Sequence, residues 1–176
     1  MIAPPAYATR ANWFARLGSP LSSGDLAECR DYLDALGYAN ATRIERVADW
    51  QRAEAIVRDP AWDSTWWQRE SEEREQLLND LRLRLGSVAT LERLSAATEL
   101  ASETIYAAAS HAAANHAMTD EALLRAACGA ATMALHESTL AQLAGRRREH
   151  LFMRKYRLFA SGRWPLGVVS ATFYIF

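Results

Sequence analysis

The sequence predicts a mainly α-helical, single-domain bundle of about five helices, followed by a short C-terminal extended segment or β-hairpin. Apolar residues recur at helical spacing between residues 23 and 159, and capping residues and glycines divide this stretch. The last residues, 166–176, are β-branched and aromatic instead. We therefore expect an N-terminal arm over 1–22, a helical bundle over 23–159, and a tail over 160–176 that packs on the bundle.

Capping residues place the first two helices. The serines at 22–23 precede Asp25, which predicts a hydroxyl cap with an acid near the positive end of the helix dipole. Gly37 predicts the end of this helix. For the second helix we predict a start at Thr42, because Glu45 follows three residues later, as in a capping box.

Three longer helices are expected next. The first begins within residues 64–65 and ends at Gly86, and the second runs from there to about residue 117. The third covers about 119–159, with Gly145 as the expected kink or break. The short connection between the last two makes them antiparallel neighbours.

The last two long helices are rich in alanine. On the earlier one, a set of small residues faces away from Ile105: Ala96, Ala107, Ser110 and Ala114. A helix that is small or apolar on two sides usually packs closely on both. We therefore expect this helical hairpin to form the middle of the bundle.

Apolar side chains are expected to tie both ends of the chain to the bundle. The N-terminal arm offers four residues for docking: Tyr7, Trp13, Phe14 and Leu17. The tail forms either one extended segment or a small hairpin with its turn near residues 170–171. Because a lone hairpin is only marginally stable in water, the tail must pack on the bundle or on another chain.

Composition narrows the class of protein. The chain has 20 basic and 21 acidic residues, so its overall charge neither favours nor excludes nucleic acid. Cys29 and Cys128 show no metal-binding or redox spacing, and we expect both to be reduced. The N-terminus lacks the pattern of a signal peptide, and no stretch is apolar enough to span a bilayer. We expect a cytoplasmic protein without membrane contact.

Four residues on the two long helices are the candidates for catalysis. Folding the helical hairpin about Met118 places Glu99 level with Glu137, and His136 close to Glu103. A cluster of carboxylates with a histidine inside a bundle is a place where a raised pKa or a metal could occur. The Glu-x-x-His pattern of di-iron bundles is absent, so we expect no metal and no cofactor. The alternative is that these acids bind Arg or Tyr of neighbouring helices.

Two charged runs could form binding surfaces. Residues 63–80 are mostly acidic, and residues 146–163 are mostly basic and alternate with aromatic residues. A basic and aromatic segment can grip phosphates and stack bases, although the chain as a whole is slightly acidic. Such runs are otherwise solvated helix faces, or they meet each other within the fold or across a homodimer.

Tryptophan residues beside the acidic run resemble a protein-binding hot spot. Trp66 and Trp67 are adjacent, so one helix face cannot bury both, and one of them should be exposed or docked on the arm. The alternative interpretation of these tryptophans is core packing. The candidate binding residues are Trp62, Trp66, Trp67, Glu70, Glu73, Arg154, Arg157 and Trp164.

We interpret the chain as a non-catalytic helical domain that binds another protein through an acidic and aromatic surface. An inhibitor or an immunity-type protein that neutralises its partner is one form of this hypothesis. The first alternative is a small helical-bundle enzyme with a site at Glu99, Glu103, His136 and Glu137. The second is nucleic-acid binding through 146–163, which the overall charge disfavours.

Overall fold

The computed structural model describes residues 11–38, 43–115 and 118–176. It confirms a mainly α-helical single domain, with six helices and a three-stranded sheet in the described residues. The elements are α1 (Ser23–Ala35), β1 (Arg43–Arg46), α2 (Trp50–Val57), α3 (Thr65–Leu85), α4 (Ser87–Asn115), α5 (Glu121–Leu143), α6 (Leu151–Ala160), β2 (Pro165–Val169) and β3 (Thr172–Ile175). None of the helices described is long and apolar enough to cross a membrane.

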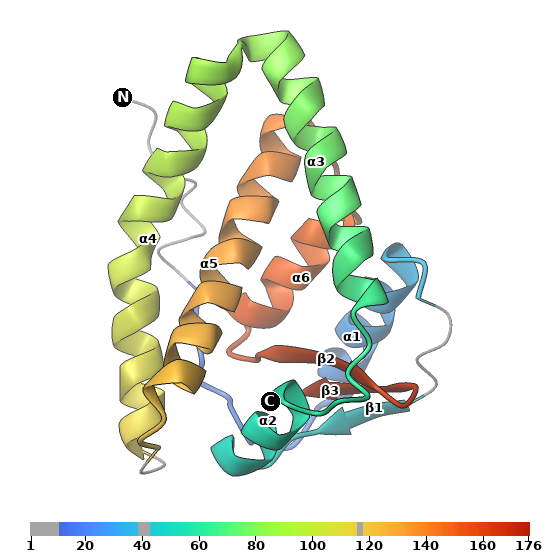
Figure 1. Cartoon of the computed structure of the whole chain (residues 1–176), viewed down its shortest axis with the longest axis vertical. Helices are drawn as coiled ribbons and strands as arrows, with labels where there is room; N and C mark the ends of the chain where they lie inside the picture. The colour runs from blue at the N-terminus through green and yellow to red at the C-terminus, as the bar shows by residue number, and fades with distance from the viewer. Residues whose placement is uncertain (1–10, 39–42, 116–117) are drawn as a thin grey trace.

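Helices α3 and α4 meet at one end of the molecule and diverge from there, with α5 between them (Figure 1). The small sheet lies at the opposite end of the molecule, near α1 and α2. Helix α5 packs against α3, α4 and α6, and every residue from 134 to 141 except His136 is buried. The centre of the bundle is therefore α5.

The expected central position of α4 is wrong. Its antiparallel contact with α5 is confirmed, and Ala101, Ile105 and Ala109 are buried there. Of the small residues on its other side, Ala96, Ala107 and Ala114 are exposed and Ser110 is half-buried. Alanine is compatible with both an interface and a solvated helix surface, so its abundance does not show how many sides of a helix are covered.

Helix α1 forms as its capping residues predict. The Ser22 side chain accepts a hydrogen bond from the backbone N–H of Asp25, and the Asp25 carboxylate accepts one from the backbone N–H of Ser22. This reciprocal pair satisfies two donors that have no partner within the helix. Gly37 follows the helix with a φ of 69°, as a C-terminal glycine should.

The predicted second helix is wrong at its start. Thr42 lies outside the described residues, and the segment from Arg43 to Arg46 is strand β1. Helix α2 begins only at Trp50, where the Asp49 side chain caps the backbone N–H of Arg52. Strand β1 pairs in parallel with β3, more than a hundred residues later in the chain, so its partner cannot be found by local spacing.

The C-terminal hairpin is confirmed. Strands β2 and β3 pair antiparallel, and β3 is the middle strand of the sheet order β1-β3-β2. The turn lies at Ser170 and Ala171, whose φ angles are 47° and 63°. Two consecutive positive φ values are the requirement of a type I′ turn, whose twist matches that of the flanking strands. The hairpin packs on the bundle through Phe173, Ile175 and other buried side chains.

Gly145 divides the predicted final helix into α5 and α6. Its φ is 73°, and its N–H bonds to the carbonyl of Gln142 while the next N–H, of Arg146, bonds to that of Ala141. This is the Schellman arrangement, which satisfies carbonyls at the end of a helix. The chain then reverses into α6, which begins at Leu151.

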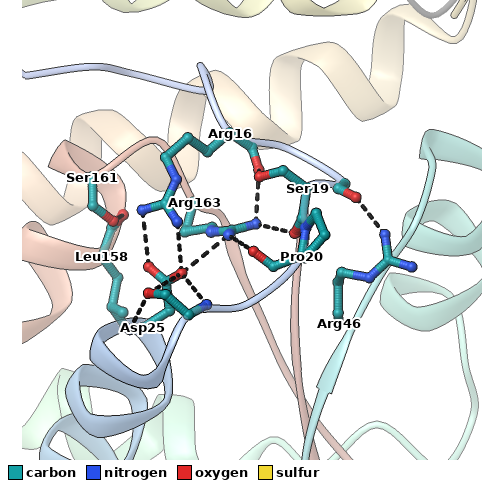
Figure 2. A network of polar contacts seen from close by, with 10 residues as sticks. Arg16, Ser19, Pro20, Asp25, Arg46, Leu158, Ser161 and Arg163 are labelled. Atoms are coloured by element: carbon teal, nitrogen blue, oxygen red, sulfur yellow. Dashed lines mark hydrogen bonds and ion pairs between the residues drawn. The ribbon is translucent and has the colours of Figure 1, made fainter.

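Arg163 ties the N-terminal segment to the rest of the molecule (Figure 2). Its side chain is fully buried, and it donates to the carbonyls of Arg16, Ser19 and Pro20 at 2.6–2.8 Å. It also donates to the Asp25 carboxylate at 3.1 Å, and Arg16 binds the same carboxylate with two donors. We call this set the Arg163 clasp.

The Arg163 clasp holds Asp25 in its charged form. Burial raises the pKa of Asp25, but hydrogen bonds from Ser22 and from Arg16 outweigh this effect, and that pKa falls to about 2. Beside the clasp the expected docking residues Trp13, Phe14 and Leu17 are buried, which confirms that this part of the arm packs on the bundle. Tyr7 lies outside the described residues.

Removing the cation of the clasp should destabilise the fold strongly. Arg163→Met leaves the buried Asp25 carboxylate and three backbone carbonyls with fewer donors, so we expect the free energy of unfolding to fall by about 3 kcal/mol. Urea denaturation measures this change. Arg43→Met, at an exposed arginine on β1, is the matched control and should change the value by less than about 0.5 kcal/mol. A loss of less than about 1 kcal/mol for Arg163→Met would contradict this role.

The hairpin turn should be improvable. Ala171 has a positive φ that costs an L-residue about 1 kcal/mol, so Ala171→Gly should raise the free energy of unfolding by roughly that amount. The same substitution at Ala126, exposed on α5, should lower it by about 1 kcal/mol, because glycine weakens a helix. Thermal or urea denaturation of both variants tests whether the free energy of unfolding changes in opposite directions.

Candidate functional site

Helices α3, α4 and α5 enclose a groove of about 810 Å³. Two of its walls are α3 and α4, and α5 supplies its floor. Its lining residues are Arg74, Glu75, Leu78, Thr98, Ser102, Glu103, Tyr106, Cys128, Gly129, Thr132, Met133 and His136. Its volume is in the range that proteins use for specific binding sites.

The groove is open because α3 and α4 diverge and because α5 presents small residues between them. Helices α3 and α4 diverge from Gly86, so they do not pack on each other along their length (Figure 1). On the floor, α5 presents small side chains at Cys128 and Thr132 and none at Gly129. A Cβ atom added at Gly129 would meet no atom within 4 Å, which shows that the space above it is free.

Large apolar side chains remain exposed along the groove. Tyr106 is 58% exposed and Met133 is 40% exposed, and half-buried Leu78 faces the same space. A second exposed apolar set, which we call the tip patch, surrounds the joint of α3 and α4 and consists of Leu83, Val88 and Leu91. Contiguous exposed apolar residues are typical of interaction sites.

The charge that the groove presents is negative. Glu75 and Glu103 are exposed, and neither forms an ion pair with any residue that the structure describes. The one basic lining residue, Arg74, already binds the Glu137 carboxylate at 2.7 Å. Burial, and then the nearby Arg74 guanidinium, lower the pKa of His136, which keeps this side chain neutral at neutral pH.

A buried charge network lies beneath the groove. Lys155 of α6 donates to Glu70 of α3 at 2.6 Å and to Glu137 of α5 at 2.9 Å. Arg74 binds the other oxygen of Glu137, and the Tyr32 hydroxyl donates to the other oxygen of Glu70 at 2.6 Å. Two acids and two bases balance, as buried charges require. The network joins α1, α3, α5 and α6.

Burial and charge pairing shift the pKa values of Glu70 and Lys155 in opposite directions. Burial raises the pKa of Glu70, and Lys155 only partly offsets that effect. Burial lowers the pKa of Lys155, but Glu137 and then Glu70 outweigh it, so the pKa of Lys155 is raised and its charge is retained. Burial, followed by the charge of Glu70, raises the pKa of Tyr32 well above its usual value.

The four candidate catalytic residues do not converge. Glu103 and His136 line the groove, whereas Glu99 is exposed and is not part of the lining. Glu137 is fully buried and faces Arg74 and Lys155, so for this acid the alternative of pairing with a base is confirmed. In the described part of the chain, no group of three or more His, Cys, Asp or Glu residues is arranged to hold a metal ion.

The predicted binding residues divide into core and surface. Trp66, Glu70 and Trp164 are buried, so core packing is the correct interpretation for Trp66, and Trp164 of the basic run is a core residue as well. Half-buried Trp62 donates its indole N–H to the carbonyl of Leu166. Trp67 is 52% exposed, which confirms that one of the two adjacent tryptophans is on the surface.

The two charged runs meet in part within the fold, through three ion pairs. Glu73 binds His150 at 3.0 Å, and Glu70 binds Lys155. Two other basic residues of the run bind acids of α1: Arg154 binds Asp31, and Arg157 binds Glu28. The arginines at 146–148 remain exposed.

Sequence reasoning missed most of the groove. Leu78, Tyr106 and Met133 have the spacing of core residues, and only the divergence of α3 from α4 leaves them uncovered. One signal in the sequence did point to the buried network. Of the 20 basic residues, 19 are arginines and Lys155 is the only lysine. A compact ammonium with three donors suits a site between two carboxylates better than a planar guanidinium does.

Removing the ammonium should make stability depend on pH. Lys155→Met leaves Glu70 under-compensated, so we expect the free energy of unfolding at pH 7 to fall by about 3 kcal/mol. Without Lys155 the folded-state pKa of Glu70 rises further above its unfolded value, so the folded variant takes up a proton as the pH falls. The difference in the free energy of unfolding between wild type and Lys155→Met should therefore become smaller by about 1 kcal/mol as the pH falls from roughly 7 to 5.

Urea denaturation at both pH values measures this effect. The double variant Glu70→Gln/Lys155→Met lacks the titrating carboxylate and should not show the narrowing. An equal deficit at both pH values for Lys155→Met would contradict the assigned role of Glu70.

The comparisons with known proteins give no match, whether with family models, with curated proteins or with solved structures.

Proposed function

We propose that this protein is a non-catalytic domain that binds another protein in the groove between α3, α4 and α5. The observation that carries the proposal is an open groove in which Tyr106 and Met133 are exposed beside acids without ion-pair partners in the described structure. Proteins commonly bind a segment of a partner in an apolar groove, where aromatic residues and Met provide the contact area and charges steer the approach.

The polar groups around the groove support binding better than catalysis. Arg74 is bound to Glu137, and the remaining acids, Glu75 and Glu103, lie on opposite walls. An acidic groove favours a partner with a basic contact surface. An inhibitor of the immunity type, which neutralises a basic partner protein by covering its working surface, is the form of this proposal that we favour.

Capture of a partner from the source cells tests the proposal. The immobilised wild-type protein should retain a protein that the groove variant Tyr106→Ala/Met133→Ala retains at least about tenfold less. The matched control is Leu83→Ala/Val88→Ala, which truncates two apolar side chains of the tip patch that are even more exposed than Tyr106 and Met133. This control should retain the partner as the wild type does, and circular dichroism should show that both variants are folded.

Two outcomes would contradict the proposal. If the wild type retains no protein above the level of an unrelated helical domain, protein binding is wrong. If the tip-patch variant loses the partner while the groove variant keeps it, the groove is the wrong surface.

A further inference from the structure

We infer that the segment bound in the groove is an amphipathic α-helix with Lys or Arg on both of its flanks. This inference rests on the proposed function and adds the chemistry of the partner segment. It follows from the shape of the groove, from the positions of its charges, and from the neutralisation of the one base in its lining.

The shape fits a short length of helix. The lining extends from Thr98 to Tyr106 on α4 and from Cys128 to His136 on α5. At 1.5 Å per residue, the α4 wall and the α5 floor are each lined over about 12 Å, which corresponds to roughly two turns of a bound helix. The free space above Gly129 can accept a large apolar side chain, and Leu78, Tyr106 and Met133 line the same groove.

The charges are placed on the two walls rather than on the floor. Glu75 lies on α3 and Glu103 on α4, and each has a second exposed acid one turn earlier, Glu72 and Glu99. No ion pair of any of these four acids occurs in the described structure. Like charges on neighbouring turns destabilise a helix, so an opposite charge from outside would relieve repulsion on both walls.

The bases nearby indicate which end of the groove is acidic. Arg74 is neutralised by Glu137, so it does not offset the acids on the walls. Beyond the lining, toward the joint of α3 and α4 at Gly86, the three bases at 82, 84 and 93 outnumber the two acids at 80 and 92. The basic residues of the bound helix should therefore lie toward the end of the groove that is remote from this joint.

A nucleic acid does not fit the same groove. Its phosphates would meet acidic walls, and the only base in the lining is already paired. An apolar face between two basic flanks instead complements an apolar floor between two acidic walls.

The probe is a fluorescein-labelled peptide of about 14 residues, made of Leu and Lys at amphipathic helical spacing. Two peptides serve as comparisons: one with Glu in place of Lys, and one with the Leu/Lys composition in scrambled order. Fluorescence anisotropy measures binding. We expect the Leu/Lys helix to bind, the Leu/Glu helix not to bind, and added salt to weaken the complex.

Alkylation of Cys128 by iodoacetamide locates the bound peptide. Cys128 lines the groove and is half-buried, so iodoacetamide can reach it, although burial raises the pKa of its thiol. Cys29 is fully buried, and burial raises its pKa to about 12, so it should react far more slowly. The Leu/Lys helix should slow the alkylation of Cys128 at the concentrations at which it binds.

Charge-neutralising variants test the two walls. Glu75→Gln/Glu103→Gln should weaken binding of the Leu/Lys helix by about tenfold. The matched control is Asp34→Asn/Glu149→Gln, which removes two exposed acids outside the groove and should change the affinity by less than about twofold.

Four results would overturn the inference. They are equal affinity for the Leu/Lys and Leu/Glu helices, equal affinity for the scrambled peptide, binding that leaves Cys128 alkylation unchanged, and protection of Cys128 by a DNA duplex or by self-association of the protein instead. If a protein is captured through the groove while the peptide fails, only the chemistry of the partner segment is wrong. If the peptide binds and no protein is captured, the proposed function fails.

Discussion

The Lys155 ammonium between two fully buried carboxylates is the interaction on which the structure most depends. Glu70 and Glu137 come from helices that are far apart in the chain, and each would be costly to bury alone. Lys155 and Arg74 neutralise them, and Tyr32 satisfies a remaining oxygen. Because a buried charge must keep its partners, this network determines how α1, α3, α5 and α6 are positioned relative to one another.

The Arg163 clasp uses a buried cation in the same way just beyond the C-terminal end of α6. A buried arginine binds three backbone carbonyls and Asp25, and so connects the N-terminal segment, the start of α1 and the beginning of the hairpin. The carbonyls belong to a segment without regular structure, which has no helix or strand to satisfy them. Buried cations thus hold together the parts of the chain that secondary structure leaves apart.

The buried network determines the charge of the groove. Arg74 reaches the groove from α3, and its charge is cancelled by Glu137 below the floor. The lining is therefore apolar in its centre and acidic on its walls, although α3 and α4 both contain arginines. A network that stabilises the fold also sets the charge that the groove presents to a partner.

The sequence by itself determined where most helices and the hairpin begin and end. The Ser22 cap, the stops at Gly37 and Gly145, and the turn at Ser170 depend on φ angles and hydrogen bonds within a few residues. Such preferences act wherever the segment is placed, so they can be inferred without knowing the rest of the fold.

Only the tertiary structure decided the remaining features. Strand β1 forms because β3 lies beside it, and Glu137 faces Arg74 and Lys155 rather than α4. The exposure of Tyr106 and Met133 depends on the angle between α3 and α4. The physical reason is that these features are contacts between residues distant in the chain, and helical spacing shows which residues share a face but not what covers that face.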